Sequence, residues 1–177
     1  ADFAQMAHAG VEHLTGLGHR RIIALMRETA SDDAHARQDH THELLRAAQK
    51  LGVEILVRQV PEAALAGADI VRSGGLIEGC SAVLSNNPAA VVGLACAAQA
   101  HGLSVPADLS VLTLGITQDS VRRGEAFSEL SVNRETMGAE AGSLLLRRLR
   151  GEPDPSQHRG LMPAVLTDRG STALRRS

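Results

Sequence analysis

Aromatic residues are almost absent from this 177-residue chain, which has no tryptophan, no tyrosine and two phenylalanines. A surface that stacks nucleic-acid bases needs aromatic rings, so none is expected here. Positive charge is not in excess either, since 18 lysine and arginine residues stand against 20 acidic residues, for a formal net charge of −2. This balance attracts neither DNA nor an anionic membrane. Any DNA binding is therefore expected to come from outside this chain.

Cysteines and long apolar runs are scarce as well. Cys80 and Cys96 lack metal-binding spacing and lie in apolar surroundings, which is typical of reduced thiols in a cytoplasmic protein. No apolar run is long enough to span a bilayer, and no signal peptide is recognised. The chain starts with Ala1 and enters a helical pattern almost at once, which suggests a piece of a longer protein.

Familiar catalytic and nucleotide-binding signatures are missing, including G-x-S-x-G, a Walker loop, G-x-G-x-x-G after a strand and H-E-x-x-H. One polar cluster could hold a metal, because His35, Asp39 and His42 would share one helix face. A polar helix start, with acids favoured by the helix dipole, explains the cluster more simply. We therefore expect no enzyme, no cofactor and no metal site.

Strand-like and helix-like patterns alternate along the chain. Strands are predicted at 21–26, 53–57, 81–85, 109–114, 127–132 and 162–167, and helices at 3–14, 36–51, 61–73, 88–102 and 134–149. The alternation predicts an α/β fold, a Rossmann-like parallel sheet with helices on both faces. Ligands of such sheets bind at the carboxyl ends of the strands. The loops that would form a site are 27–36, 59–62, 86–88 and 115–119.

The alanine-rich helix predicted from Pro88 has small residues on several sides. Its face with Val92 and Cys96 could pack tightly within the domain or against a partner subunit. Both readings can hold for one helix, and both stay open.

Five segments carry a family pattern in a fixed order. They are 11–22 (VEHLTGLGHRRI), 102–111 (GLSVPADLSV), 130–138 (LSVNRETMG), 144–151 (LLLRRLRG) and 161–172, with LMPAVL followed by RGST. Together they resemble the effector-binding core of the LacI/GalR family of transcription regulators. The resemblance implies a periplasmic-binding-protein-like fold of type I, with two Rossmann-like subdomains behind a helix-turn-helix headpiece that this chain lacks.

By that resemblance, one subdomain is nearly complete and the other is mostly missing. Residues 1–19 form a helix of the first subdomain, 20–126 the effector-binding C-terminal subdomain, 127–150 a strand and helix returning to the first, 151–160 a crossover linker, and 161–177 the closing strand and tail. Two helices would then lack the strands they pack on. We expect their apolar side chains to be exposed and to drive self-association, namely Phe3, Met6, Leu14, Met137, Leu145 and Leu149.

The resemblance also places a ligand pocket. The family's effector-binding arginine falls on His40, with Arg37 one turn earlier, and a position where the family often has an aromatic ring falls near Glu62. The aspartate that usually grips sugar hydroxyls falls on Gly115. Most usual contacts are changed, so the pocket is poorly equipped for an ordinary sugar.

The family's Asn-Asp pair falls on Asn87-Pro88, so Asn87 is the one retained contact. It could bind a small polar ligand, or it could only cap the helix that Pro88 opens. A residue that only caps should tolerate Asn87→Asp, which keeps the capping oxygen.

The resemblance implies a function. The chain would be the effector-sensing and dimerisation core of a DNA-binding repressor, with a small-molecule effector, a homodimer using Val92 and Cys96, and operator DNA bound only through the absent headpiece. A free-standing solute-binding protein, which shares the fold, is the alternative. A metal-dependent enzyme using the His35–His42 cluster is a weaker one.

Overall fold

A six-stranded sheet forms the centre of the protein, in the order β2-β1-β3-β4-β5-β6. The computed structural model describes residues 3–28, 34–74, 79–115, 127–152 and 162–175, with only the backbone for 34–39. The strands are β1 (Arg21–Arg27), β2 (Glu54–Val60), β3 (Ala82–Ser85), β4 (Ser110–Leu114), β5 (Ser128–Ser131) and β6 (Val165–Thr167). The first five are parallel. This confirms the predicted α/β fold with a parallel sheet.

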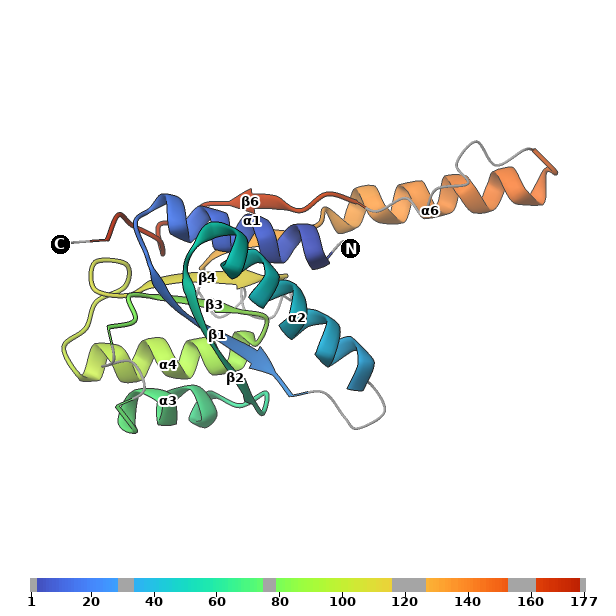
Figure 1. Cartoon of the computed structure of the whole chain (residues 1–177). Helices are drawn as coiled ribbons and strands as arrows, with labels where there is room; N and C mark the ends of the chain where they lie inside the picture. The colour runs from blue at the N-terminus through green and yellow to red at the C-terminus, as the bar shows by residue number, and fades with distance from the viewer. Residues whose placement is uncertain (1–2, 29–33, 75–78, 116–126, 153–161, 176–177) are drawn as a thin grey trace.

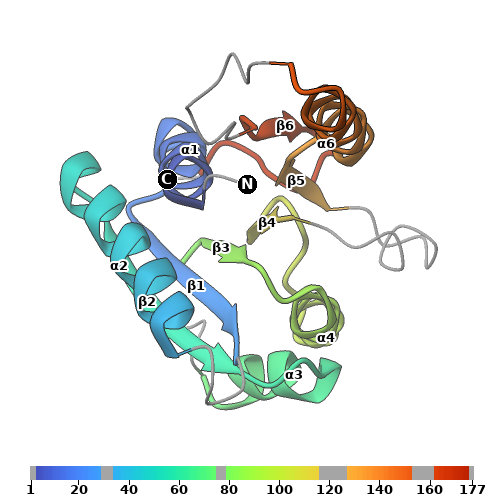
Figure 2. The ribbon, with the colours of Figure 1, turned by 90° about the vertical axis from the view of Figure 1, so that its right-hand side faces the viewer.

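Helices cover both faces of the sheet (Figures 1 and 2). One face carries α1 (Phe3–Gly16) and α2 (Ala34–Leu51), and the other carries α3 (Ala64–Arg72) and α4 (Pro88–Ala100). A further helix, α6 (Arg134–Leu149), extends away from the body (Figure 1). The two layers bury β1, β3 and β4 from both sides, whereas β2 is partly exposed and β6 is exposed.

Strand β1 shows why its sequence is a continuous apolar run. Ile22, Ala24 and Met26 pack into the core under α1 and α2, whereas Ile23 and Leu25 pack into the core on the opposite face. Successive side chains of a strand point to opposite faces, so a strand covered on both sides must be apolar throughout.

The two helices expected to be bare behave differently. In α1, Met6 and Leu14 are buried in the core over the sheet, so the expectation that they would be exposed is wrong. The glycine at position 10 lets α1 lie close to the sheet, because a Cβ there would be 3.1 Å from a Leu84 methyl group. In α6, by contrast, no residue is buried, as expected.

Two further details differ from the sequence patterns. β6 is antiparallel to β5 and has three residues, fewer than the predicted strand at 162–167. α3 begins at Ala64, three residues after Pro61, because the Ala63 N–H turns back to the Pro61 carbonyl at 2.8 Å.

Helices α3 and α4 interlock through two glycines. A Cβ on Gly67 would lie 1.7 Å from the Ala90 carbonyl oxygen, and a Cβ on Gly93 would lie 1.7 Å from the Ala64 carbonyl oxygen. Neither position can hold a side chain without separating the helices. Tight packing of α4 within the domain is therefore observed on its Gly93 side.

Candidate functional site

Four parallel strands end at one edge of the sheet, where the fold places ligands. Arg27 ends β1, Val60 ends β2, Ser85 ends β3, and Leu114 ends β4, followed by Gly115. Residues 29–33 and 116–126 lie outside the described part of the chain. The site is therefore built here from the strand ends and the start of α4.

Asn86 lies directly after β3 and reaches across to β1. Its Oδ1 accepts a hydrogen bond from the Arg27 backbone N–H at 2.8 Å, which holds the amide group at the carboxyl edge. The residue is half-buried, and among the described contacts its Nδ2 has no partner. An amide held in this way can donate to a polar ligand.

Asn87 is fully buried, and all of its side-chain hydrogen-bonding groups are used by the protein. Its Oδ1 accepts from the Ala90 N–H at 3.1 Å, which caps α4. Its Nδ2 donates to the carbonyl oxygens of Val60 and Pro61 at 3.2 and 3.0 Å. Asn87 thus ties the end of β2 to the start of α4, and Asn87→Asp would set a carboxylate against two carbonyl oxygens. The predicted ligand contact stays a prediction.

Glu62 and Gly115 flank these residues. Glu62 Oε2 is 3.1 Å from Arg27 Nη1, in a pair whose side chains are about half exposed (49% and 47%). Gly115 has a φ of +66°, and no atom of the described residues lies within 4 Å of the place its Cβ would occupy. Among the described residues, the carboxyl edge therefore presents a half-exposed ion pair, an amide group held by the Arg27 N–H and a glycine with no neighbour at its Cβ position.

His40 lies on α2 and is engaged with α1. Its ring stacks on Phe3 with 3.7 Å between ring centroids and 23° between planes. The side chain of Arg37 lies outside the described residues, as do those of His35 and Asp39. In the part of the chain that is described, no three His, Cys, Asp or Glu side chains gather as a metal site requires.

The α4 face predicted for dimerisation is partly exposed to solvent. Cys96 is an exposed free thiol, and Val92 is half-buried. On the neighbouring helix α3, Leu65 is also exposed. These apolar side chains leave a surface that a partner could cover.

The opposite, amino edge of the sheet carries a histidine network that sequence reasoning missed. His19 Nδ1 is 2.8 Å from Ser81 Oγ, and Nε2 is 3.0 Å from Ser110 Oγ and 3.1 Å from the Ala173 carbonyl oxygen. Because Nε2 must donate to the carbonyl, Nδ1 accepts from the Ser81 hydroxyl. Burial lowers the pKa of His19, and the Ala173 carbonyl offsets this only in part. A neutral ring with both nitrogens engaged is a structural link to the chain's tail.

The tail crosses the same edge. Ser171 Oγ donates to the Val111 carbonyl at 2.6 Å and accepts from the Ser128 N–H at 2.7 Å. Arg169 Nη2 lies 2.9 Å from Glu129 Oε1 in a largely buried ion pair. A cavity of about 270 Å³ beside the tail is lined by His19, Gly79, Cys80, Ser81, Pro106, Ala107, Asp108, Leu174 and Arg175. It lies at the amino ends of β3 and β4, away from the predicted ligand edge.

Asn86 is the residue of the carboxyl edge that the sequence comparison passed over. The resemblance places the family's Asn on Asn87, so Asn86 was not considered as a contact. Asn86 and Asn87 are the same residue type, and only the helix start at Pro88 separates their roles. The capping role that the sequence also allows for Asn87 is observed.

Comparison with known proteins identifies the family to which the chain belongs. No helix in the described ranges combines the length and apolar character needed to cross a membrane. None of the curated proteins matches the chain. Solved structures do match it. A LacI family transcriptional regulator from Bifidobacterium animalis is similar with a TM-score of 0.81 and 21% identity, over 97% of this chain and 62% of that one.

Two further structures are similar. One is a LacI family regulator from Enterococcus faecium with bound ribose (TM-score 0.75, 20% identity, 99% of this chain and 65% of that one). The other is a dimeric Lac repressor (TM-score 0.76, 24% identity, 99% of this chain and 63% of that one). This chain spans less than two thirds of the length of each. A family model for the periplasmic binding protein-like domain matches residues 11–172. The chain thus belongs to the periplasmic binding protein-like domain family, with the fold of LacI-family transcriptional regulators.

Proposed function

We propose that the chain is the effector-sensing core of a DNA-binding transcription regulator. The observation that carries the proposal is the carboxyl edge of the sheet in a chain of this family, where Arg27 contacts both Asn86 and Glu62 and Gly115 follows the neighbouring strand β4. A small molecule bound there would favour one arrangement of the parent protein over another, and so change its affinity for DNA. DNA contact itself would lie outside this chain.

The proposed ligand contacts start with the Asn86 amide and the Arg27–Glu62 pair. Arg37, His40 and Gly115 remain proposed members of the site, and Asn87 acts by positioning the loop before α3. The absence of a side chain at Gly115 favours a ligand other than an ordinary sugar, because sugar hydroxyls need paired polar partners. The ligand class stays open between sugars and other small polar metabolites.

Calorimetric titration tests the ligand role. The panel would hold sugars, nucleosides and amino acids, with ribose included because the Enterococcus faecium relative has it bound. We expect Asn86→Ala to weaken binding by about 1–3 kcal/mol, the cost of a lost hydrogen bond at a part-buried site. Glu54→Ala is the matched control, because Glu54 lies at the other end of β2. Equal affinities for the chain and Asn86→Ala would contradict this site.

The dimer is a separate part of the proposal. The face with Val92 and Cys96 would meet the same face of a second copy, as an isologous contact. Cys96 offers a direct readout, because an exposed thiol near a two-fold axis can be cross-linked. Cross-linking through Cys96 that requires Val92 would support this face, and its persistence in Val92→Arg would contradict it.

A free-standing solute-binding protein remains the second candidate, since the family description itself names periplasmic binding proteins. DNA binding discriminates the two. The chain alone, with its net charge of −2, should show no specific binding to operator DNA, whereas the longer regulator should bind it with a steep salt dependence. Specific, salt-sensitive binding by this chain alone would contradict the assignment of DNA contact to another part.

A further inference from the structure

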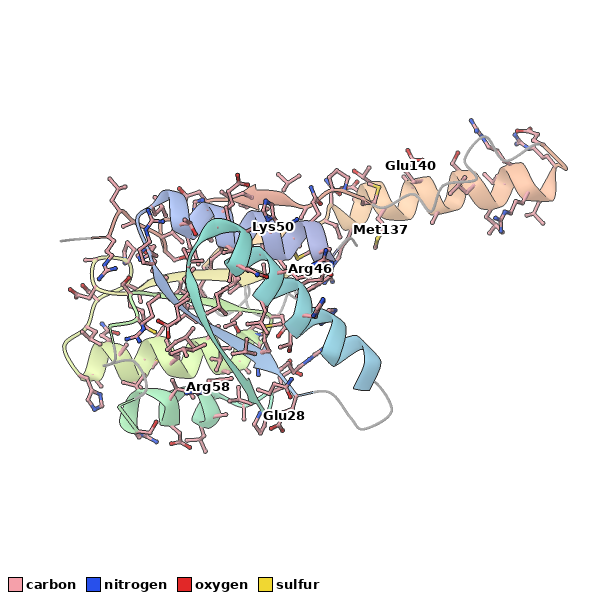
Figure 3. The ribbon with its side chains drawn as sticks, viewed as in Figure 1. Glu28, Arg46, Lys50, Arg58, Met137 and Glu140 are labelled. Atoms are coloured by element: carbon pink, nitrogen blue, oxygen red, sulfur yellow. The ribbon has the colours of Figure 1, made fainter. Side chains whose placement is uncertain are left out.

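The cavity at the amino edge of the sheet has a volume of about 270 Å³. This is slightly below the ~300 Å³ at which small-molecule pockets typically begin, so the cavity fits a small ligand. It lies at the other end of the sheet from Glu28, which follows β1 and is labelled in Figure 3. Its lining comes from the segments before β1, β3 and β4 and from the tail, which contribute His19, Ser81, Asp108, Leu174 and Arg175. The cavity is therefore separate from the site proposed above.

The tail is anchored on both sides of Leu174. The Ala173 carbonyl accepts a hydrogen bond from His19 Nε2 at 3.1 Å, and the Arg175 N–H donates to the Leu17 carbonyl at 2.8 Å. Between these anchors, the apolar side chain of Leu174 is 72% exposed. The backbone thus holds both Leu174 and Arg175 at the cavity before any ligand binds.

Arg175 supplies a guanidinium, the tail guanidinium, to the cavity lining. In the described part of the chain it forms neither an ion pair nor a side-chain hydrogen bond. Burial is the main cause that lowers the pKa of His19, and the charge of Arg175 lowers that pKa further, so the guanidinium lies near the ring. A guanidinium presents N–H donors in a planar fork that matches the two oxygens of a carboxylate.

Two other charged side chains beside the cavity already have partners. Asp108 Oδ2 accepts from the Ser104 N–H and Oγ at 2.8 and 2.6 Å. Arg21 Nε is 2.8 Å from Glu54 Oε2, and a Cβ on Gly79 at the rim would lie 3.5 Å from Arg21 Nη1. The tail guanidinium is therefore the charged group of this lining that a ligand can engage without breaking a contact of the described residues.

Apolar groups stand beside the tail guanidinium. Leu174, Pro106 and Ala107 line the same cavity. An exposed leucine gains free energy when an apolar group covers it, at about 25 cal/mol per Å² of buried apolar area. A ligand that combines a carboxylate with a short apolar chain would use both parts of the lining, whereas inorganic phosphate would use only the charge.

We propose that this cavity binds a small carboxylate with a short apolar chain, with the carboxylate on Arg175 and the chain against Leu174 and Pro106. The site is distinct from the carboxyl edge and does not rest on the effector role. Because Leu174 and Arg175 both belong to the tail, the ligand would also fasten the tail to the sheet. Bound ligand should therefore raise the melting temperature of the chain.

Titration of the 177-residue chain with sodium butyrate, followed by ¹H–¹⁵N NMR, tests the site. The pH is neutral, so that the carboxylate is ionised, and sodium chloride keeps the ionic strength constant. We expect saturable shifts of the backbone amides of Ser81, Ala107 and Arg175. Butyramide, which has the same chain without the charge, should bind on the order of tenfold more weakly. Acetate, which lacks most of the chain, should bind several-fold more weakly.

Two variants separate the charge from the apolar contact. Arg175→Gln should weaken butyrate binding on the order of tenfold and should remove most of the difference between butyrate and butyramide. Leu174→Ser should weaken butyrate binding about threefold and leave acetate binding nearly unchanged. Both side chains are exposed, so both variants should fold, which the dispersion of the NMR spectrum checks.

Arg147→Gln is the matched control. Arg147 is also exposed, and its side chain has no ion pair among the described residues. It lies on α6, the helix that extends beyond the body and on which Figure 3 labels Glu140. The same substitution there removes the same charge and should leave butyrate binding unchanged.

Four results would overturn the proposal. The first is a set of shifts that grow with butyrate without saturating. The second is saturable binding whose shifts lie at Arg27 and Asn86, on the carboxyl edge. The third is equal affinity of the chain and Arg175→Gln for butyrate. The fourth is inorganic phosphate that binds at Arg175 as tightly as butyrate, which would show a site for any anion.

Discussion

Helices α4 and α6 begin in the same way and end up in opposite environments. Asn87 caps α4 through the Ala90 N–H, and Asn133 caps α6 through the Thr136 N–H. Both helices contain glycine and alanine. Yet α4 has six buried residues and α6 has none. Local signals therefore decide where a helix starts, and its neighbours decide which of its residues carry stability.

The largest expected difference between α4 and α6 is in the change of stability when a glycine is replaced by alanine. Gly93→Ala places a methyl group on the Ala64 carbonyl oxygen. Because this is a backbone atom that cannot rotate away, we expect the free energy of unfolding to fall by about 3 kcal/mol or more. Gly142→Ala meets no atom of the described residues within 4 Å and should stabilise α6 by roughly 0.5–1 kcal/mol, since alanine favours helix over glycine. Urea unfolding of both variants measures the contrast, and similar free-energy changes for the two substitutions would contradict it.

The two capping asparagines give the next largest difference. Asn87→Asp removes the donors to the Val60 and Pro61 carbonyls, and we expect a loss of about 2 kcal/mol, as for a buried hydrogen-bonding group left unpaired. Asn133→Asp keeps its cap at an exposed helix start and should change stability by less than about 0.5 kcal/mol. Thermal unfolding of the two variants decides. Tolerance of Asn87→Asp would show that its amide contacts contribute little.

Lowering the pH should destabilise the sheet and its packed helices more than α6, and by less than the substitutions above. Burial lowers the pKa values of His13 and His19 below 6.5 in the folded protein, whereas the unfolded chain binds protons at the ordinary value. The stability linked to these pKa shifts is therefore fully present above pH 6.5 and is lost as the pH falls from 6.5 through the folded pKa values. Helix α6 contains no histidine.

The measurement is thermal unfolding followed from about pH 7.5 to about pH 5.5, a range that brackets the ordinary pKa of histidine. The melting temperature of the body should fall over this range, and His13→Gln should reduce the fall because it removes one of the two groups. His13 Nε2 lies 3.1 Å from Thr172 Oγ1, so the tail should be released before the sheet. A melting temperature independent of pH would contradict the role of these histidines.

Much of the fold could be predicted from local patterns. The bounds of α6 agree with the sequence, because Asn133 caps its start and Gly151 follows its end. The buried strands were recognised because parallel strands covered on both faces are apolar throughout. The same alternation identified the carboxyl edge, where Asn86 and the Arg27–Glu62 pair lie.

Other features depend on contacts between residues distant in sequence. The place of α1 over the sheet depends on how Gly10 meets Leu84, which no local pattern reveals. His19 joins Ser81, Ser110 and Ala173 across up to 154 positions. Asn86 and Asn87 differ only in which partners lie nearby, so their roles could not be separated from sequence alone. The periodicity of the sequence thus predicts helices and strands, whereas the contacts between them determine the roles of individual residues.

The route of the tail across the amino edge has a consequence for synthesis. Strands β4 and β5 share hydrogen bonds with Ser171, and Arg169 neutralises Glu129, yet these partners are made after every strand of the sheet. Folding during translation starts from the N-terminal part. While the ribosome still holds residues 169–171, β1 to β4 can assemble, but Glu129 lacks its cation and the Ser128 N–H lacks its acceptor. The β5 side of the sheet therefore gains these contacts only after residues 169–171 have left the ribosome.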